Sequence, residues 1–351
     1  MYRLTPQNRL ALLMHDAAGK PAGKMGYGLL RYGAAPVVAV VDRSAAGQRL
    51  YEMTGIPAAR GVPIVASVRE ALAFAPDVLV PAIAPPGGNL PAEWRAEVAD
   101  ALDAGLSVAN GLHTPLGRDP ELAGRVKRPG QFLWDIRQEP DGLMPGGGRA
   151  REVPARRVLF VGTDMNCGKM TAALELTRAL SDAGVRARFL ATGQIGIAIA
   201  GEGVALDAVR VDYASGAIEQ MVLKHGYDHD VLLVEGQGSL LNPASTATLP
   251  LLRGAMPTHL ILVHRAGQET ISRADWVRIP PLRDVIRLYE AVAAAAGALP
   301  AAPVVGVVLN TSRLGDADAA EAVARARDET GLPATDVVRF GPGPLLDAVR
   351  G

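Results

Sequence analysis

The sequence predicts an α/β protein of two domains, each a mainly parallel sheet flanked by helices. Short apolar runs alternate with longer amphipathic stretches along the whole chain, as expected for parallel strands joined by crossover helices. In the second half, one apolar run leads into a glycine-containing turn that opens a long helix. The chain has 351 residues, of which 49% are hydrophobic, and this is enough for two ordinary cores.

In the first half, apolar runs predict the strands and the amphipathic stretches between them predict the helices. The predicted strands are Leu10–Met14, Val37–Val41, Val78–Ala82 and the shorter Leu106–Ala109. The predicted helices are Ala22–Tyr32, Val68–Phe74 and Ala92–Ala104, and the stretch Phe132–Arg137 closes this half. Residues 1–137 therefore form the first predicted domain.

The second half begins after a stretch in which glycine, proline and arginine crowd together without periodicity, which predicts a linker over residues 138–154. Residues 155–351 form the second predicted domain. Its strands are predicted at Val158–Val161, Val185–Leu190, Val231–Val234, Leu260–Val263, Val304–Leu309 and near Asp336–Arg339. Its helices are predicted at Gly168–Ala183, Tyr213–His225, Leu282–Ala296 and Ala317–Thr330.

Composition and charge argue against several functional classes. Lys and Arg number 36, and Asp and Glu also number 36, so the chain lacks the basic excess on which nucleic-acid affinity depends. Cys167 is the single cysteine, which excludes a disulfide framework and suits a reducing compartment. No apolar stretch is long enough for a membrane span or a signal peptide. We expect a soluble, cytoplasmic homo-oligomer with a small-molecule substrate and with neither nucleic acid nor a membrane as a partner.

The strongest motif lies where a buried strand, a turn and a helix meet. In a loop of this kind, a P-loop, backbone N–H groups point inward around a phosphate and the helix N-terminus adds partial positive charge. Lys169 adds a full charge, and Gly168 lets the backbone approach the ligand closely. The cofactor-binding residues that this motif predicts are Gly162, Thr163, Asp164, Asn166, Gly168, Lys169, Met170 and Thr171.

Two departures from the usual motif bear on its chemistry. Five residues separate the two glycines instead of four, a spacing similar to that of the dethiobiotin synthetase branch of P-loop enzymes. Met170 stands where Ser or Thr usually ligates magnesium, and Thr171 is rotated about 100° around the helix from that position. The motif therefore predicts phosphate binding more firmly than magnesium-dependent hydrolysis. The alternative is a turn that merely packs.

Polar side chains also follow other predicted strands, at the ends where ligands bind in open α/β sheets. Glu235 follows the run Val231–Val234 and could act as a general base, or else cap its own glycine-rich turn. Thr192 and Gln194 lie among glycines, and suit either ligand contact or turn formation. The substrate-binding residues we predict are Thr192, Gln194, Asp212, Gln237 and His264.

The remaining candidates are weaker. His113 follows a short strand and is the best acid–base candidate of the first half, because histidine titrates near neutral pH. Asp42 ends a strand and could bind a ribose or serve in a turn, although the nearby glycines lack the dinucleotide-binding spacing. For Cys167, packing in the loop is favoured over a nucleophilic role. No spacing resembles a zinc site, so we expect no metal.

Several segments resemble a known family of unknown function, number sixteen-eleven, which fuses a Rossmann-like domain to a P-loop domain. The matching segments are Gly162–Asp164 through Gly168–Met170, Ala191–Gln194 with Gly196, Leu206–Val209, Ala214–Glu219, Glu235–Ser239 and Gly111–His113. The resemblance implies a Rossmann-like first domain and a P-loop NTPase-like second domain. It also implies transfer of acetyl from acetyl-CoA to the amine of D-glutamate, the activity attributed to some members.

This implied chemistry suits the loop, because coenzyme A carries phosphates that a P-loop can hold without hydrolysing anything. By similarity to dethiobiotin synthetase, Asn310 at the end of its strand would contact an adenine ring. The hypothesis is an N-acyltransferase in which Glu235 or His113 takes the proton of the amine. The alternatives are an ATP- and magnesium-dependent carboxylate–amine ligase of dethiobiotin-synthetase type, and a non-catalytic nucleotide-binding regulator.

Overall fold

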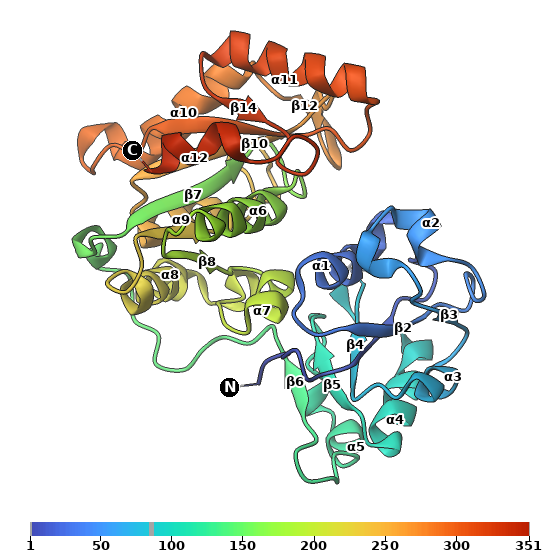
Figure 1. The fold of residues 1–351 in the computed structure, drawn as a ribbon. Helices are drawn as coiled ribbons and strands as arrows, with labels where there is room; N and C mark the ends of the chain where they lie inside the picture. The colour runs from blue at the N-terminus through green and yellow to red at the C-terminus, as the bar shows by residue number, and fades with distance from the viewer. Residues whose placement is uncertain (1, 84–87, 351) are drawn as a thin grey trace. The chain divides into compact units, whose positions relative to one another are not determined.

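The computed structural model describes residues 2–83 and 88–350. By the contacts between its residues, the chain divides into two units, whose elements are labelled in Figure 1. The first unit is Met1–Gln138 together with Gln194–Ala208, and the second is Glu139–Gly193 together with Val209–Gly351. A short segment from the second half of the sequence therefore belongs to the first unit.

The first unit is built on a six-stranded parallel sheet with the strand order β3-β2-β1-β4-β5-β6. Its strands are β1 (Leu10–Leu13), β2 (Val37–Val41), β3 (Ile64–Val65), β4 (Val78–Pro81), β5 (Ser107–Asn110) and β6 (Leu133–Asp135). This is the strand order of the Rossmann fold, in which the order reverses beside the first strand. The Rossmann-like fold expected for this half is confirmed.

The α-helices described in this unit include one that comes from the second half of the sequence. They are α1 (Lys24–Tyr32), α2 (Leu50–Thr54), α3 (Val68–Ala71), α4 (Arg95–Ala104), α5 (Pro120–Ala123) and α7 (Gln194–Ala200). Helix α7 packs against α1. Nearby, a Cβ on Gly111 would lie 2.7 Å from Sδ of Met25 and 3.3 Å from Cγ of Gln194, so only glycine fits there without displacement.

The second unit is built on another six-stranded parallel sheet, with the order β14-β13-β10-β7-β9-β8. Its strands are β7 (Arg156–Gly162), β8 (Ala187–Leu190), β9 (Val231–Val234), β10 (His259–Arg265), β13 (Val304–Asn310) and β14 (Ala334–Thr335). Strand β7 lies between β10 and β9 and is buried along almost its whole length. The turn that follows it is therefore held by the centre of the sheet.

Helices and a small hairpin complete the second unit. The α-helices described are α6 (Lys169–Asp182), α8 (Val211–His225), α9 (Thr248–Ala255), α10 (Leu282–Ala294), α11 (Asp316–Thr330) and α12 (Gly343–Arg350). The hairpin pairs β11 (Thr270–Ile271) with β12 (Ala274–Arg278) in antiparallel fashion and lies between β10 and α10 in the chain. The expected P-loop fold of this half is confirmed by this sheet and its helices.

One predicted strand, near Asp336–Arg339, is wrong. The last strand, β14, ends at Thr335, and the chain then turns. The carboxylate of Asp336 accepts hydrogen bonds from the N–H groups of Val338 and Arg339 and from the N–H of Thr311. When an aspartate side chain accepts hydrogen bonds from the N–H groups that follow it, the backbone forms a turn instead of pairing with a neighbouring strand.

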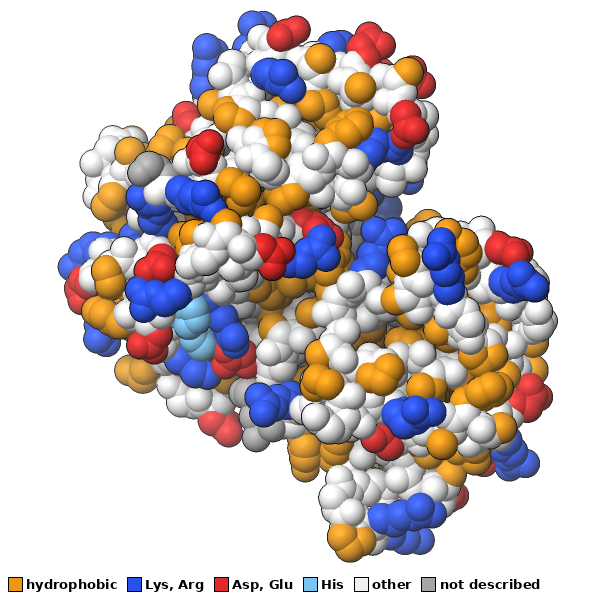
Figure 2. Space-filling model, viewed as in Figure 1, with side chains coloured by type: hydrophobic (Ala, Val, Ile, Leu, Met, Phe, Trp, Pro, Cys, Tyr) orange, Lys and Arg blue, Asp and Glu red, His pale blue; other side chains and the backbone are white. Residues whose placement is uncertain are grey.

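Charged side chains of both signs are interspersed over the face of the molecule shown in Figure 2. Acidic and basic side chains are thus mixed on this face rather than separated by sign. Such mixing leaves only a weak net field to steer a charged ligand toward this face. Within residues 2–83 and 88–350, no helix is long and apolar enough to cross a membrane.

Candidate functional site

The P-loop joins the carboxyl end of β7, at Gly162, to the first turn of α6, at Lys169. The N–H of Thr163 donates to the carbonyl of Val263 on β10, at 3.1 Å. The hydroxyl of Tyr289, a fully buried side chain of α10, donates to the carbonyl of Gly162 at 2.7 Å. The entry to the loop is therefore fixed by a neighbouring strand and by a helix.

The backbone of the loop is shaped to present its N–H groups. Gly168 has a φ of 120°, which a residue with a Cβ rarely adopts, so glycine is required at this point. The N–H groups of Cys167 and Gly168 form no hydrogen bond with any residue that the structure describes. Unsatisfied N–H donors at a helix N-terminus are the groups that phosphate oxygens bind. The loop therefore fits a phosphate-bearing ligand.

Lys169 is buried under the loop, with 5% of its surface exposed. Its Nζ donates to the carbonyl of Asp164 at 2.8 Å and lies 3.6 Å from Sγ of Cys167. A lysine ammonium has three protons, so it can keep these two contacts and still donate to an anion. Lys169 thus has the position and charge to bind a phosphate, and its hydrogen bond to the carbonyl of Asp164 also stabilises the loop.

The carboxylate of Asp164 is fully buried and accepts four hydrogen bonds. Its Oδ1 accepts from the N–H of Met165 at 2.7 Å and from Nδ2 of Asn242 at 2.8 Å. Its Oδ2 accepts from Nε2 of Gln268 at 2.6 Å and from the N–H of Ser272 at 2.8 Å. Burial alone would raise the pKa of this carboxyl, but the hydrogen bonds outweigh burial and lower it. Asp164 therefore organises the loop from within the protein.

Glu235 directly follows β9 and is buried. Its Oε2 accepts from the N–H of Thr192 at 2.8 Å and from the N–H of Gly193 at 3.1 Å. Its Oε1 accepts no hydrogen bond from any described residue. Burial raises the pKa of Glu235 to about 7, against the opposing effects of the two N–H groups and of the Lys169 charge. A carboxyl with this pKa can accept a proton near neutral pH.

The segment after Glu235 packs tightly against its neighbours. A Cβ on Gly236 would lie only 1.5 Å from the carbonyl oxygen of Phe160 on β7, so no larger residue fits. The side-chain amide of Gln237 donates to the carbonyl of Thr192, whose own hydroxyl donates to the carbonyl of Glu235 at 2.8 Å. Glu235 is therefore held between two rigid turns, and the amide of Gln237 is used inside the protein.

Two further predicted residues come from the ends of β10 and β13. Nδ1 of His264 lies 2.9 Å from Oγ1 of Thr163 in the loop. Burial, and then the charge of Arg265, lower the pKa of His264 to about 4, so the ring is neutral at pH 7. Nδ2 of Asn310 donates to the carbonyl of Cys167 at 3.1 Å. Both side chains are therefore attached to the P-loop.

Other predicted residues lie in the first turns of helices. Met170 and Thr171 are half-buried in the first turn of α6. Asp212 is exposed in the first turn of α8, and no hydrogen bond or ion pair joins it to a described residue. Over the described ranges, no group of three or more His, Cys, Asp or Glu residues could hold a metal ion. Asp212 is thus the predicted site residue with the least structural support.

In the first unit, His113 belongs to a cluster with Arg137 and Asp207. Nη1 of Arg137 lies 3.0 Å from Nε2 of His113 and also donates to the Asp207 carboxylate. Burial, and then the Arg137 charge, lower the pKa of His113, so its neutral ring accepts from the guanidinium. Nε of Arg137 donates to the carbonyl of Gly111 at 2.8 Å. Gln194 lies in α7 of this same unit, whereas Thr192 belongs to the second unit.

Asp42 has a structural role in the first unit. Its buried carboxylate accepts from the N–H groups of Asp16 at 3.0 Å and Ala18 at 2.9 Å, and from both the N–H and the hydroxyl of Ser44. These donors shape the turns after β1 and β2. The turn alternative therefore accounts for Asp42, and no oxygen of this carboxylate is left without a protein donor.

Comparison with known proteins identifies the family. A model of the Rossmann-like domain of DUF1611 matches residues 43–139, and a model of its P-loop domain matches residues 145–346. The chain belongs to the DUF1611 family. A crystal structure of a DUF1611 protein from Anabaena variabilis is 55% identical, with a TM-score of 0.95 over 98% of this chain and 99% of that one. The family and two-domain fold expected from the sequence are thus confirmed.

Two curated relatives carry a functional name. A protein of Tritonibacter scottomollicae named D-glutamate N-acetyltransferase is 36% identical over 293 residues, covering 81% of this chain and 84% of the relative. A protein of a Pseudoalteromonas species with the same name is 33% identical over 282 residues, covering 80% and 83% of the two chains. These names agree with the enzyme class that the family resemblance implied.

Proposed function

We propose that this protein is an N-acetyltransferase that transfers acetyl from acetyl-CoA to the amine of a small amino acid, with D-glutamate as the substrate. The two relatives named for this activity support the proposal. The P-loop supports it as well, because its N–H groups and Lys169 suit the phosphates of coenzyme A, while Met170 replaces the usual magnesium ligand.

The observation that supports the mechanism is the hydrogen bonding and the raised pKa of Glu235. One of its oxygens is fixed by two backbone N–H groups, the other accepts no hydrogen bond from a described residue, and its pKa is about 7. At neutral pH this carboxylate removes a proton from the substrate ammonium. The free amine then attacks the thioester carbonyl carbon, the C–S bond breaks, and the sulfur leaves as the coenzyme A thiol after taking a proton. One proton is released overall.

His113 is less suited to this role than Glu235. Its Nε2 lies 3.0 Å from the guanidinium of Arg137, which donates into the lone pair that a base would use. Burial, and then the positive charge of Arg137, also lower the pKa of His113. We therefore assign proton removal to Glu235, and expect His113 to orient groups around Arg137.

The test is a direct assay with two readouts. The purified protein is incubated with acetyl-CoA and with D-glutamate, L-glutamate or a panel of other amino acids, and free thiol is measured. In parallel, ADP release is measured with magnesium and ATP. Thiol release that depends on D-glutamate is expected. ADP release would indicate the ligase instead, and ligand binding without either product would indicate a regulator.

Removal of metal ions provides an independent prediction. Because a thioether cannot ligate magnesium at position 170, EDTA should leave the rate of acetyl transfer unchanged within about twofold. The rate of thiol release is measured before and after EDTA, and again after added magnesium. Loss of activity in EDTA with recovery in magnesium would contradict the proposed role of the loop.

A further inference from the structure

The loop that begins at Glu235 continues into residues 239–242, which we call the bridging segment because they contact the P-loop. Ser239 of this segment is buried, with 1% of its surface exposed. Its hydroxyl donates to the carbonyl of Thr163 at 3.0 Å and accepts from the N–H of Leu241 at 3.1 Å. This hydroxyl therefore joins the backbone of the P-loop to the backbone of the bridging segment.

The hydroxyl of Tyr289, on α10, forms a second bridge of the same kind, one residue earlier in both segments. It accepts from the N–H of Leu240 at 3.1 Å and donates to the carbonyl of Gly162 at 2.7 Å. A third bond, from Nδ2 of Asn242 to Oδ1 of Asp164 at 2.8 Å, extends the contact. Tyr289 is fully buried, so loss of its hydroxyl would leave an N–H and a carbonyl without their partner away from water, which is unfavourable.

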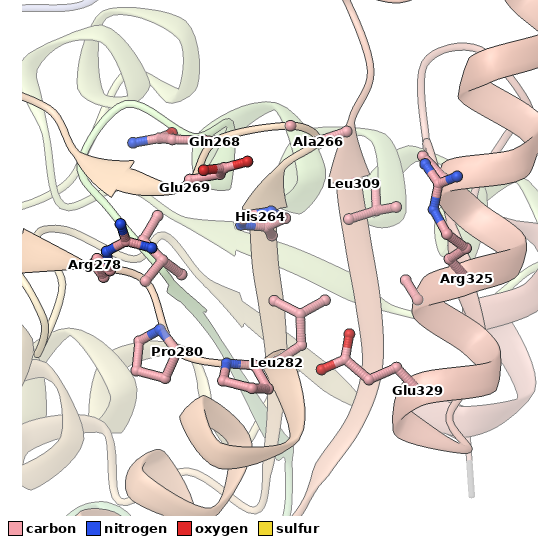
Figure 3. Close-up of a pocket in the computed structure, with 15 residues that line it drawn as sticks. His264, Ala266, Gln268, Glu269, Arg278, Pro280, Leu282, Leu309, Arg325 and Glu329 are labelled. Carbon is pink, nitrogen blue, oxygen red and sulfur yellow. The ribbon is translucent and has the colours of Figure 1, made fainter.

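The contact with Ser239 completes the bonding of Thr163. The N–H of Thr163 donates to the carbonyl of Val263 at 3.1 Å, and its Oγ1 lies 2.9 Å from Nδ1 of His264. Figure 3 shows His264 at the end of β10, where it lines a pocket of about 420 Å³. All three polar groups of Thr163 are thus bonded inside the protein. The entry of the P-loop is fixed by β10 and by the bridging segment together.

The loop that carries Glu235 also touches the lysine of the P-loop. A Cβ on Gly236 would lie 2.9 Å from Cδ of Lys169, so the stem of this lysine packs on the backbone next to Glu235. Burial raises the pKa of Glu235, and the charge of Lys169 is among the effects that oppose the rise. The group that suits a phosphate and the group that suits a base therefore lie on adjoining loops of the second unit.

From these bonds we propose that Ser239 and Tyr289 are positioning residues for acetyl transfer: their hydroxyls fix the P-loop against the loop that carries Glu235. The phosphates of the donor, held by the P-loop, then determine where its thioester lies relative to that carboxylate. Binding energy from a part of a substrate remote from the reacting atoms is used in this way to orient them. The proposal rests on the proposed function, and adds to it the residues that connect the donor site to the base.

The experiment compares acetyl-CoA with acetylpantetheine, which has the same thioester arm without the nucleotide phosphates. Tyr289→Phe and Ser239→Ala each remove one hydroxyl and little volume. With saturating acetyl-CoA, the single-turnover rate should fall about tenfold or more in each variant, because the bound thioester is misplaced relative to Glu235. With acetylpantetheine, which gives the P-loop no phosphate to hold, kcat/KM should change less than about twofold.

Thr335→Val is the matched control. The hydroxyl of Thr335 is also buried and donates to a backbone carbonyl, that of Gly341, at 2.8 Å. Thr335 lies on β14, which two strands of the sheet separate from β7. This variant should lower the Tm about as much as the other two and leave the rates with both donors unchanged, because its effects are independent of the two loops.

Two kinetic outcomes would overturn the proposal. An equal loss with both donors in Tyr289→Phe and Ser239→Ala would mean that the hydroxyls only stabilise the fold. A higher KM for acetyl-CoA with an unchanged saturating rate would mean that they only support phosphate binding.

Hydrogen exchange gives a second measurement, which needs no turnover and uses pyrophosphate as the ligand of the P-loop. At about ten times its Kd, pyrophosphate should slow exchange of the N–H groups of Leu240 and Leu241 about tenfold in the wild type. In Tyr289→Phe this slowing should be lost at Leu241, although Ser239, the acceptor of that N–H, is intact. In Ser239→Ala it should be lost at Leu240, whose acceptor is Tyr289.

The exchange data also separate this proposal from the proposed function. No slowing in the wild type, or equal slowing in the wild type and the variants, would overturn the proposal. If the wild-type protein releases no thiol with any amino acid but shows the expected exchange, the proposed function fails and the connection between the two loops stands.

Discussion

Replacing Lys169 by alanine should weaken acetyl-CoA binding about ten- to a hundredfold. The expected loss is roughly 1.5–3 kcal/mol, the range for a hydrogen bond to a charged group. The geometry gives the reason, because the ammonium lies under a loop whose N–H groups at Cys167 and Gly168 form no hydrogen bond with a described residue. Raising the salt concentration should weaken the wild-type complex more than the variant complex, since only the wild type keeps the charge pair.

The competing explanation is that Lys169 only ties the loop together. It has the contacts for this, because Nζ donates to the carbonyl of Asp164 at 2.8 Å. A purely structural lysine predicts a lower Tm of the ligand-free variant with unchanged affinity of the folded fraction. Tm and acetyl-CoA affinity are therefore measured on the same Lys169→Ala preparation. Unchanged affinity would remove the P-loop from the proposed mechanism.

Most of the fold could be predicted because its strands are buried on both faces and are therefore continuous apolar runs. The run Val231–Val234 is an example, since the predicted and observed strand coincide. Elements without such a run were missed. Strand β3 has two residues, and α7 begins within the sequence Gly193-Gln194-Ile195-Gly196, whose glycines indicate a loop rather than a helix. Helix α7 belongs to the first unit because it packs against α1, and no local sequence pattern predicts such a tertiary contact.

The candidate site was predictable only where a motif marks it. The P-loop has a fixed order of glycines and lysine, so its position could be predicted together with the strand and helix that flank it. Asp164 was expected to bind the ligand, but its oxygens are used by donors that include Gln268, 104 residues away. Likewise Arg137 and Asp207 are 70 residues apart in the sequence. Contacts across such distances depend on the sheet order, which the sequence pattern does not specify.

Replacing Glu235 by glutamine should have the largest effect on turnover. If Glu235 removes the ammonium proton, the rate of acetyl transfer should fall about 10²–10⁴-fold, the usual contribution of a general base. The fold should survive, because the amide oxygen of glutamine can accept the same N–H groups of Thr192 and Gly193. Single-turnover rates at saturating substrates measure the effect without interference from binding.

The pH dependence of Glu235 has a defined sign for both activity and stability. A base must be ionised to accept a proton, so the wild-type rate should rise with pH and level off above about 7. This rise of the rate with pH should be absent in Glu235→Gln. Because burial raises the pKa of Glu235 in the folded state above its ordinary value, the folded state binds the proton more tightly than the unfolded state does. Stability is therefore greatest below the ordinary pKa and falls as pH rises to about 7.

This loss amounts to roughly 3 kcal/mol at 1.36 kcal/mol per pKa unit, and it should be absent in the glutamine variant. Urea unfolding of both proteins between about pH 4 and pH 8 measures it. A carboxylate that only caps its glycine-rich turn would produce the same stability difference, but it would leave the pH dependence of the rate in place. Only a catalytic base makes the rate and the stability depend on the same ionisation. If the rate of Glu235→Gln still rises with pH near 7, proton removal belongs to another residue. His113 would then be tested with the conservative variant His113→Gln.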